Sequence, residues 1–265
     1  MSRANPLDSG AIFRPTPTDE DLANPHKGCC TFQRFNGDPL FPGMKWSESG
    51  PLEFPPPVHC LETWPARAPG ANAGTAPGYL PSTVAYCRWF WRDMEPQAEQ
   101  YDFSMIDGAL ATAAARGQTL ALRLMPFGHV PSGQPRLPDW YGAKCPTQAY
   151  GALEKTAPVY DSEEYLQTWG RFVREFARRY DADRRLETVD VAFIGAWGEG
   201  GGQCCAEQCE RFAELYRQAF RQTPRLALVA GKTGAGDQLR SGILRGSGWR
   251  ADGFVLVESR LHPSG

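Results

Sequence analysis

The chain has 265 residues, of which 42% are hydrophobic and 22% are charged, so it is an ordinary globular protein with enough apolar side chains for a sizeable core. The formal net charge of −2 and the scattering of the arginines exclude a concentrated basic surface, and we expect no nucleic-acid partner. This length suits a single domain, because single α/β barrels are common at about 250 residues.

The N-terminal sequence MSRANPLDSG lacks the apolar core of about 7–15 residues that a signal peptide needs. No run elsewhere approaches the ~18 apolar residues that span a bilayer. We therefore expect no membrane partner and a cytoplasmic location, or an extracytoplasmic one if the N-terminus is incomplete. The closest cysteines, Cys204, Cys205 and Cys209, have no nearby histidine to complete a zinc site, so neither a metal nor an organic cofactor is expected.

The first half of the chain predicts strands separated by a long loop and one helix. A first strand is predicted over 28–36, followed by a Pro- and Gly-rich irregular segment over 37–82. The apolar run over 83–92, interrupted by Arg88, is typical of a strand buried on both faces. A helix over 102–118 is predicted from the pair Ser104 and Asp107, read as a capping box, and from Gly117 as its stop. The next strand is predicted over 119–125 and contains Arg123.

The second half begins with another irregular segment over 126–160 and continues as alternating helices and strands. An amphipathic helix is predicted over 161–180, with glutamates in its first turn and arginines in its last. Five further elements follow: a fourth strand in the stretch VDVAFIGAWGEGGG (189–202), a helix over 206–222, a strand over 225–231, a short helix over 238–245 and a sixth strand from about residue 252.

Alternating helices and apolar strands predict an α/β fold with a parallel sheet. A doubly wound sheet and a (β/α)8 TIM barrel both fit this order. The barrel is favoured because polar, aromatic and glycine residues gather just after the strands, and because GxGxxG does not follow the first strand. We expect an N-terminal extension over 1–23 and one barrel domain over 24–265.

Glu199 is the first candidate for catalysis because it follows an apolar strand directly, where barrel active sites lie. A carboxyl group beside the indole of Trp197 in a partly dry pocket would have a raised pKa, as a general acid requires. Two other interpretations are equally open: Glu199 caps the following helix, or it bridges an arginine inside the barrel.

Arg88 and Arg123 occupy equivalent places in two apolar strands, and a buried guanidinium group needs a carboxylate partner. They are expected either to organise an acid such as Glu199 or Asp252 or to form a structural ion pair. Glu95, before a proline, is expected to fix its loop. His129 is a candidate base or sugar ligand, although a lone loop histidine is commonly just exposed.

Eight tryptophans are present, and flat rings with a polar edge suit sugar faces, although core packing accounts for most of them. Trp91, Trp140 and Trp197 are the candidate sugar-binding aromatics: Trp91 and Trp197 lie toward the ends of two apolar runs, and Trp140 lies in an irregular segment.

The segment YCRWFWRDMEPQAEQYDFSMIDGALATAAARGQTLALRLMP resembles the second and third βα units of clan A glycoside hydrolases. The motifs NPHKGCCTFQRFNGDPL, PDWY, IGAWGEG and GWRAD, in that order, resemble the β-galactosidase-like proteins that carry a DUF4832-type domain. This resemblance covers roughly residues 24 to 252.

The resemblance implies a glycosidase-type (β/α)8 barrel that acts on a β-linked sugar or oligosaccharide, with Glu199 as the strand-four acid/base. The clan carries asparagine directly before this glutamate, where the chain has Gly198. Its nucleophile comes from strand seven, whereas about six βα units are expected here, so the chain is predicted to be truncated and Asp252 is the candidate second carboxylate. The alternatives are a carbohydrate-binding barrel without turnover and an inactive fragment of a longer glycosidase-like protein.

Overall fold

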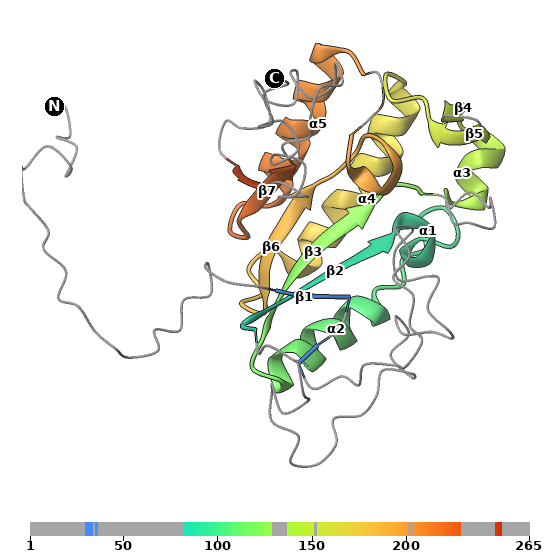
Figure 1. Cartoon of the computed structure of the whole chain (residues 1–265). Coiled ribbons are helices and arrows are strands. Elements are labelled where there is room, and N and C mark those ends of the chain that lie inside the picture. The colour runs from blue at the N-terminus through green and yellow to red at the C-terminus, as the bar shows by residue number, and fades with distance from the viewer. Residues whose placement is uncertain are drawn as a thin grey trace, which may run out of the picture.

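The structure is a computed structural model and describes residues 30–33, 35–36, 82–128, 137–150, 153–200, 202, 204–228 and 247–250. Within these residues six strands form one parallel sheet in the order β1-β2-β3-β6-β7-β8 (Figure 1). The strands are β1 (Thr31–Phe32), β2 (Val84–Phe90), β3 (Thr119–Met125), β6 (Leu186–Val191), β7 (Arg225–Leu228) and β8 (Gly248–Arg250).

The order of the strands in this sheet follows their order along the chain, which identifies the architecture. A doubly wound sheet reverses its strand order at a switch point, whereas a barrel adds each strand beside the previous one. The fold is therefore α/β, an incomplete (β/α)8 barrel, and the predicted fold class is confirmed.

The helices are α1 (Trp91–Met94), α2 (Ser104–Ala115), α3 (Asp139–Lys144), α4 (Glu163–Tyr180) and α5 (Ala206–Ala219), with one 3-10 turn, η4 (Ala196–Gly198). Figure 1 shows α4 and α5 side by side along the sheet. At the end where β2 and β3 finish lie α1, α3 and an antiparallel hairpin of β4 (Thr147–Tyr150) and β5 (Leu153–Pro158).

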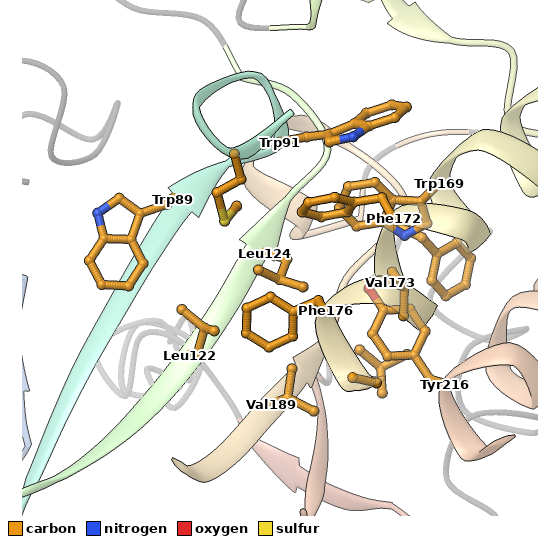
Figure 2. Close-up of a cluster of buried hydrophobic side chains, with 14 of the residues drawn as sticks. Trp89, Trp91, Leu122, Leu124, Trp169, Phe172, Val173, Phe176, Val189 and Tyr216 are labelled. Carbon is orange, nitrogen blue, oxygen red and sulfur yellow. The ribbon is translucent and has the colours of Figure 1, made fainter. Parts of the chain in front are cut away.

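Side chains along the strands alternate between the helices and the inside of the barrel. Leu122 and Leu124 of β3 and Val189 of β6 meet Phe172 and Phe176 of α4 in the apolar cluster of Figure 2. The residue between the two leucines is an arginine, which the period of two directs to the opposite face. The strands are thus apolar on the helix side and carry charge on the inner side.

The sequence of helix α4 provides a cap at its start, charges that complement the dipole at both ends, and an apolar face that is buried. The hydroxyl of Ser162 accepts a hydrogen bond from the backbone N–H of Tyr165, 3.1 Å away, and caps the first turn. Glutamates in that turn and Arg178 and Arg179 in the last one complement the helix dipole. Trp169 and Phe172, both completely buried, anchor the helix on the sheet.

Several predicted boundaries were wrong. Trp91 begins helix α1 and does not continue the strand, and the segment over 126–160, expected to be irregular, contains α3 and the β4–β5 hairpin. Helix α2 is preceded by Asp102, whose Oδ1 accepts from the backbone N–H of Ser104 at 2.9 Å, so the expected capping box is not formed. The helix predicted over 238–245 lies outside the described residues, and β8 begins before the predicted residue 252.

None of the helices in the described part of the chain is both long enough and apolar enough to cross a membrane.

Replacing Phe172 by alanine should lower the free energy of unfolding by about 3–5 kcal/mol, because the ring is completely buried between α4 and its aromatic neighbours. Urea denaturation measures the change. Arg178→Ala on the exposed side of the same helix is the control and should change stability by about 0.5 kcal/mol or less. Equal effects of the two substitutions would contradict the packing described above.

Candidate active site

The segment after β6 leaves the sheet and forms a tight loop that carries Glu199. Three buried tyrosines hold this loop. Tyr216 donates to the carbonyl of Ala192 at 2.8 Å, Tyr165 donates to the carbonyl of Phe193 at 2.6 Å, and the hydroxyl of Tyr160 accepts from the N–H of Gly195 at 3.1 Å. The apolar run AFIG is therefore buried as a loop, not as the continuation of the strand that the sequence predicts.

The loop needs glycine at two positions. Gly195 has φ +80°, and a Cβ there would lie 1.6 Å from the carbonyl oxygen of Gly200. Gly198 has φ +72°, and a Cβ there would lie 2.5 Å from the Cβ of Ala192. At both positions these contacts and the positive φ explain why a side chain does not fit.

The carboxylate of Glu199 pairs with two arginines from neighbouring strands. Its Oε1 accepts from Nη1 of Arg88 and from Nη1 of Arg123, both at 2.7 Å. Of the described residues, none donates a hydrogen bond to Oε2, and the side chain keeps 33% of its surface exposed. One carboxylate oxygen is thus held by two guanidinium groups, and the other accepts no hydrogen bond from the described residues.

The sheet register brings the two arginines together. Arg88 of β2 and Arg123 of β3 are direct cross-strand partners, so their side chains leave the same face of the sheet. The guanidinium group of Arg88 lies over the ring of Phe32 at 5.0 Å, and Gln33 exchanges hydrogen bonds with the backbone of Arg88. Of the interpretations left open for Glu199, a bridge to buried arginines is the one that matches these contacts.

Two further residues stand behind this cluster, and sequence reasoning missed both. Asp190 accepts through Oδ2 from Nε of Arg123 at 2.9 Å and from the hydroxyl of Tyr86 at 2.8 Å. Asp190 is 3% exposed and Arg123 is 1% exposed. The sequence did offer a signal for Asp190: it is the single charged residue in the apolar run VDVAFIG, and the same pattern identified the two arginines.

The cluster determines the ionisation of its members. Burial disfavours the charge of Arg123, but Tyr86, Asp190 and Glu199 around it raise its pKa above the usual value. Burial, with Asp190 beside the hydroxyl, raises the pKa of Tyr86 well above its usual value. These shifts favour the charged form of Arg123 and the neutral, hydrogen-bond-donating form of Tyr86.

The candidate sugar-binding tryptophans differ in how deeply they are buried. Trp91 is completely buried among Trp140, Tyr141, Trp169 and Phe172, so its predicted role as a sugar platform is wrong: a ring without an exposed face packs the core. Trp140 is partly buried, and its indole N–H donates to the carbonyl of Glu95 at 2.8 Å.

Trp197 is partly buried and lies two residues before Glu199. Its φ of 58° is unusual for a residue other than glycine. Of the three tryptophans, it is the one that lies nearest in the sequence to the candidate acid/base.

Glu95 is structural. Its carboxylate is completely buried and accepts from the indole N–H of Trp91 at 2.6 Å and from the backbone N–H of Glu99 at 2.7 Å. Arg171 lies 3.4 Å away. Burial raises the pKa of Glu95, and the two hydrogen bonds and Arg171 oppose that rise. The expectation that Glu95 fixes its loop agrees with this geometry.

His129 and Asp252 lie outside the described residues. Among the described residues, no group of three or more His, Cys, Asp or Glu side chains could hold a metal ion. Cys204, Cys205 and Cys209 are free thiols at the start of α5.

The sequence profile of one protein family, described as beta-galactosidase of the glycoside hydrolase 42 type, matches residues 79–226, more than half of the chain. No curated protein sequence matches the chain. Similar solved structures include endo-glycoceramidase II from Rhodococcus sp. as its lactosyl-enzyme intermediate, with 17% identity and a TM-score of 0.41 over 56% of this chain and 41% of that one.

A beta-galactosidase from the haloarchaeon Halorubrum lacusprofundi is similar with 13% identity and a TM-score of 0.46, over 69% of this chain and 38% of that chain. The chain thus spans about 41% of the length of the first of these solved structures.

Replacing Gly198 by asparagine should destabilise the fold by about 2–4 kcal/mol, because the new Cβ meets that of Ala192 in a strained backbone. Urea denaturation measures the loss. Gly142→Asn is the control, since a Cβ at Gly142 would meet nothing within 4 Å. A stable Gly198→Asn variant would refute the steric explanation.

Proposed function

Because the chain belongs to the beta-galactosidase family of glycoside hydrolases, we propose that it hydrolyses a β-linked sugar or oligosaccharide with Glu199 as the acid/base. The single observation that supports this role is the asymmetry of the Glu199 carboxylate. Oε1 is held by two arginines, whereas Oε2 has no donor among the described residues and belongs to a side chain that is 33% exposed.

This asymmetry suits proton transfer. A general acid must present one oxygen to the glycosidic oxygen at a fixed angle and carry the proton there. Two ion pairs on Oε1 restrict the rotation of the carboxyl group, so Oε2 is the oxygen that would give its proton to the departing sugar oxygen. The same oxygen would later take a proton from the attacking water.

A second carboxylate is needed on the other side of the bond, about 5–5.5 Å away for retention of configuration or about 6.5–9.5 Å for inversion. Asp190 does not fit this role, because it is buried behind Arg123 at 3% exposure. We assign the role to Asp252, on the resemblance of the GWRAD motif alone.

Sugar binding would use aromatic faces and polar donors near Glu199. Trp197 lies in the same loop as Glu199, and its indole would stack on a sugar ring. Arg88 and Arg123 would act through Glu199, since both are nearly buried. Trp140 and His129 are proposed to contact more distant parts of the substrate.

Glu199→Gln should lower kcat on 2-nitrophenyl β-D-galactoside by about 10²–10⁴-fold, because glutamine keeps the shape but transfers no proton. The release of nitrophenol measures the rate. The matched control is Glu187→Gln, near the start of β6, the strand that leads into the Glu199 loop. Its carboxylate accepts from the hydroxyl of Thr119 at 2.8 Å. Glu187→Gln should keep its rate within about twofold of the wild type, and full activity in Glu199→Gln would rule out the acid/base role.

The second candidate is a barrel that binds carbohydrate without cleaving it. One observation favours it: Oε1 of Glu199 is engaged by two guanidinium groups, an arrangement that also suits a purely structural carboxylate. Calorimetry with lactose separates the two functions. Binding without hydrolysis during long incubation would establish the second candidate and exclude the first.

A further inference from the structure

Behind Glu199 lies a buried chain of hydrogen bonds that the proposed reaction does not use directly. The hydroxyl of Tyr86 and the Nε of Arg123 both donate to Oδ2 of Asp190, at 2.8 and 2.9 Å. The Nη1 of the same arginine donates to Oε1 of Glu199 at 2.7 Å. Tyr86, Asp190 and Glu199 are thus joined through one guanidinium group.

A guanidinium group is planar and rigid, so fixing one edge fixes the other. Asp190 holds Nε of Arg123, and this orientation directs Nη1 to Glu199. Asp190 and Arg123 are 3% and 1% exposed, so water cannot take over the role of either partner. Nine positions along the chain separate Asp190, within β6, from Glu199, in the loop after β6, yet both carboxylates meet the same arginine.

Asp190 is also one of the two carboxylates that Arg123 meets among the described residues. Arg123 from β3 pairs with Asp190 of β6 through Nε and with Glu199 through Nη1, and Arg88 from β2 pairs with Glu199. Tyr86 donates to the same oxygen of Asp190. Replacing Asp190 removes the hydrogen bond to Nε and with it the contact that fixes the plane of the guanidinium group.

We propose that Asp190, supported by the hydroxyl of Tyr86, is a positioning residue that acts through Arg123 to orient Glu199. This inference rests on the proposed function, because it assigns Asp190 a part in the reaction of Glu199.

The experiment compares Asp190→Asn and Tyr86→Phe with a matched set elsewhere in the fold. Tyr180 donates to Oδ1 of Asp107 at 2.8 Å, and Arg179 pairs with the same carboxylate, so Tyr180→Phe and Asp107→Asn remove the same chemistry away from Glu199. For each variant, kcat and KM are measured on 2-nitrophenyl β-D-galactoside. Urea unfolding midpoints are measured for each variant alone and combined with Glu199→Gln.

Asp190→Asn should lower kcat at least tenfold with KM within about threefold of the wild type. Tyr86→Phe, which keeps the Arg123–Asp190 ion pair, should lower kcat about three- to tenfold. This variant tests the inference if Asp190→Asn does not fold. The Tyr180 and Asp107 variants should stay within about twofold. In urea, the Asp190 or Tyr86 substitution combined with Glu199→Gln should give non-additive midpoints, and the control combinations should be additive.

Additive midpoints for Asp190→Asn and Tyr86→Phe with Glu199→Gln would overturn the inference whatever the activity. Unchanged kcat in an active Asp190→Asn enzyme would overturn it as well and leave the proposed hydrolysis standing. Non-additive midpoints in a protein that hydrolyses no glycoside would instead refute the proposed function, while the link from Asp190 to Glu199 would be supported.

Discussion

Everything at the candidate site depends on the neutralisation of two arginines inside the barrel. A guanidinium group removed from water needs a partner, and breaking a buried pair typically costs about 3–5 kcal/mol because a charge is left stranded. Arg88 and Arg123 are cross-strand partners, so neither can be neutralised without affecting the other. Glu199 meets both, and Asp190 meets Arg123 from behind.

Side chains along each strand point alternately to the two faces of the sheet, and this makes the buried charges compatible with a stable fold. In β3 the leucines on either side of Arg123 pack against α4, and in β6 the valines on either side of Asp190 are buried in the same core (Figure 2). Parallel pairing in register then places the inward residues of successive strands side by side. A sheet of this kind buries its apolar side chains under helices while its inner face carries the charges that a site requires.

The sequence predicted the arginines and Glu199 for a physical reason: a charged residue in an apolar strand must find a partner, and few carboxylates were placed to provide one. Asp190 was not predicted as a site residue because the fourth strand was expected to begin at Val189, which put the aspartate at the start of the strand. In the structure Asp190 lies near the end of β6. Trp91 was misassigned because composition and position do not separate a core indole from an exposed one. The hairpin of β4 and β5 was missed because short strands without sustained alternation give no periodic signal.

The loop after β6 is joined to the charged cluster by hydrogen bonds from Arg123 to two of its residues, Trp197 and Glu199. Trp197 adopts a φ of 58°, a conformation that usually costs about 1–3 kcal/mol for such a residue and persists only where the surroundings hold it. The backbone N–H of Trp197 donates to the carbonyl of Phe127 at 2.8 Å, and the carbonyl of Trp197 accepts from Nη1 of Arg123 at 3.3 Å. Arg123 therefore holds both the strained backbone and the carboxylate two residues later. The orientation of Glu199 thus depends on the buried arginines of β2 and β3 as well as on the glycine-dependent loop that carries it.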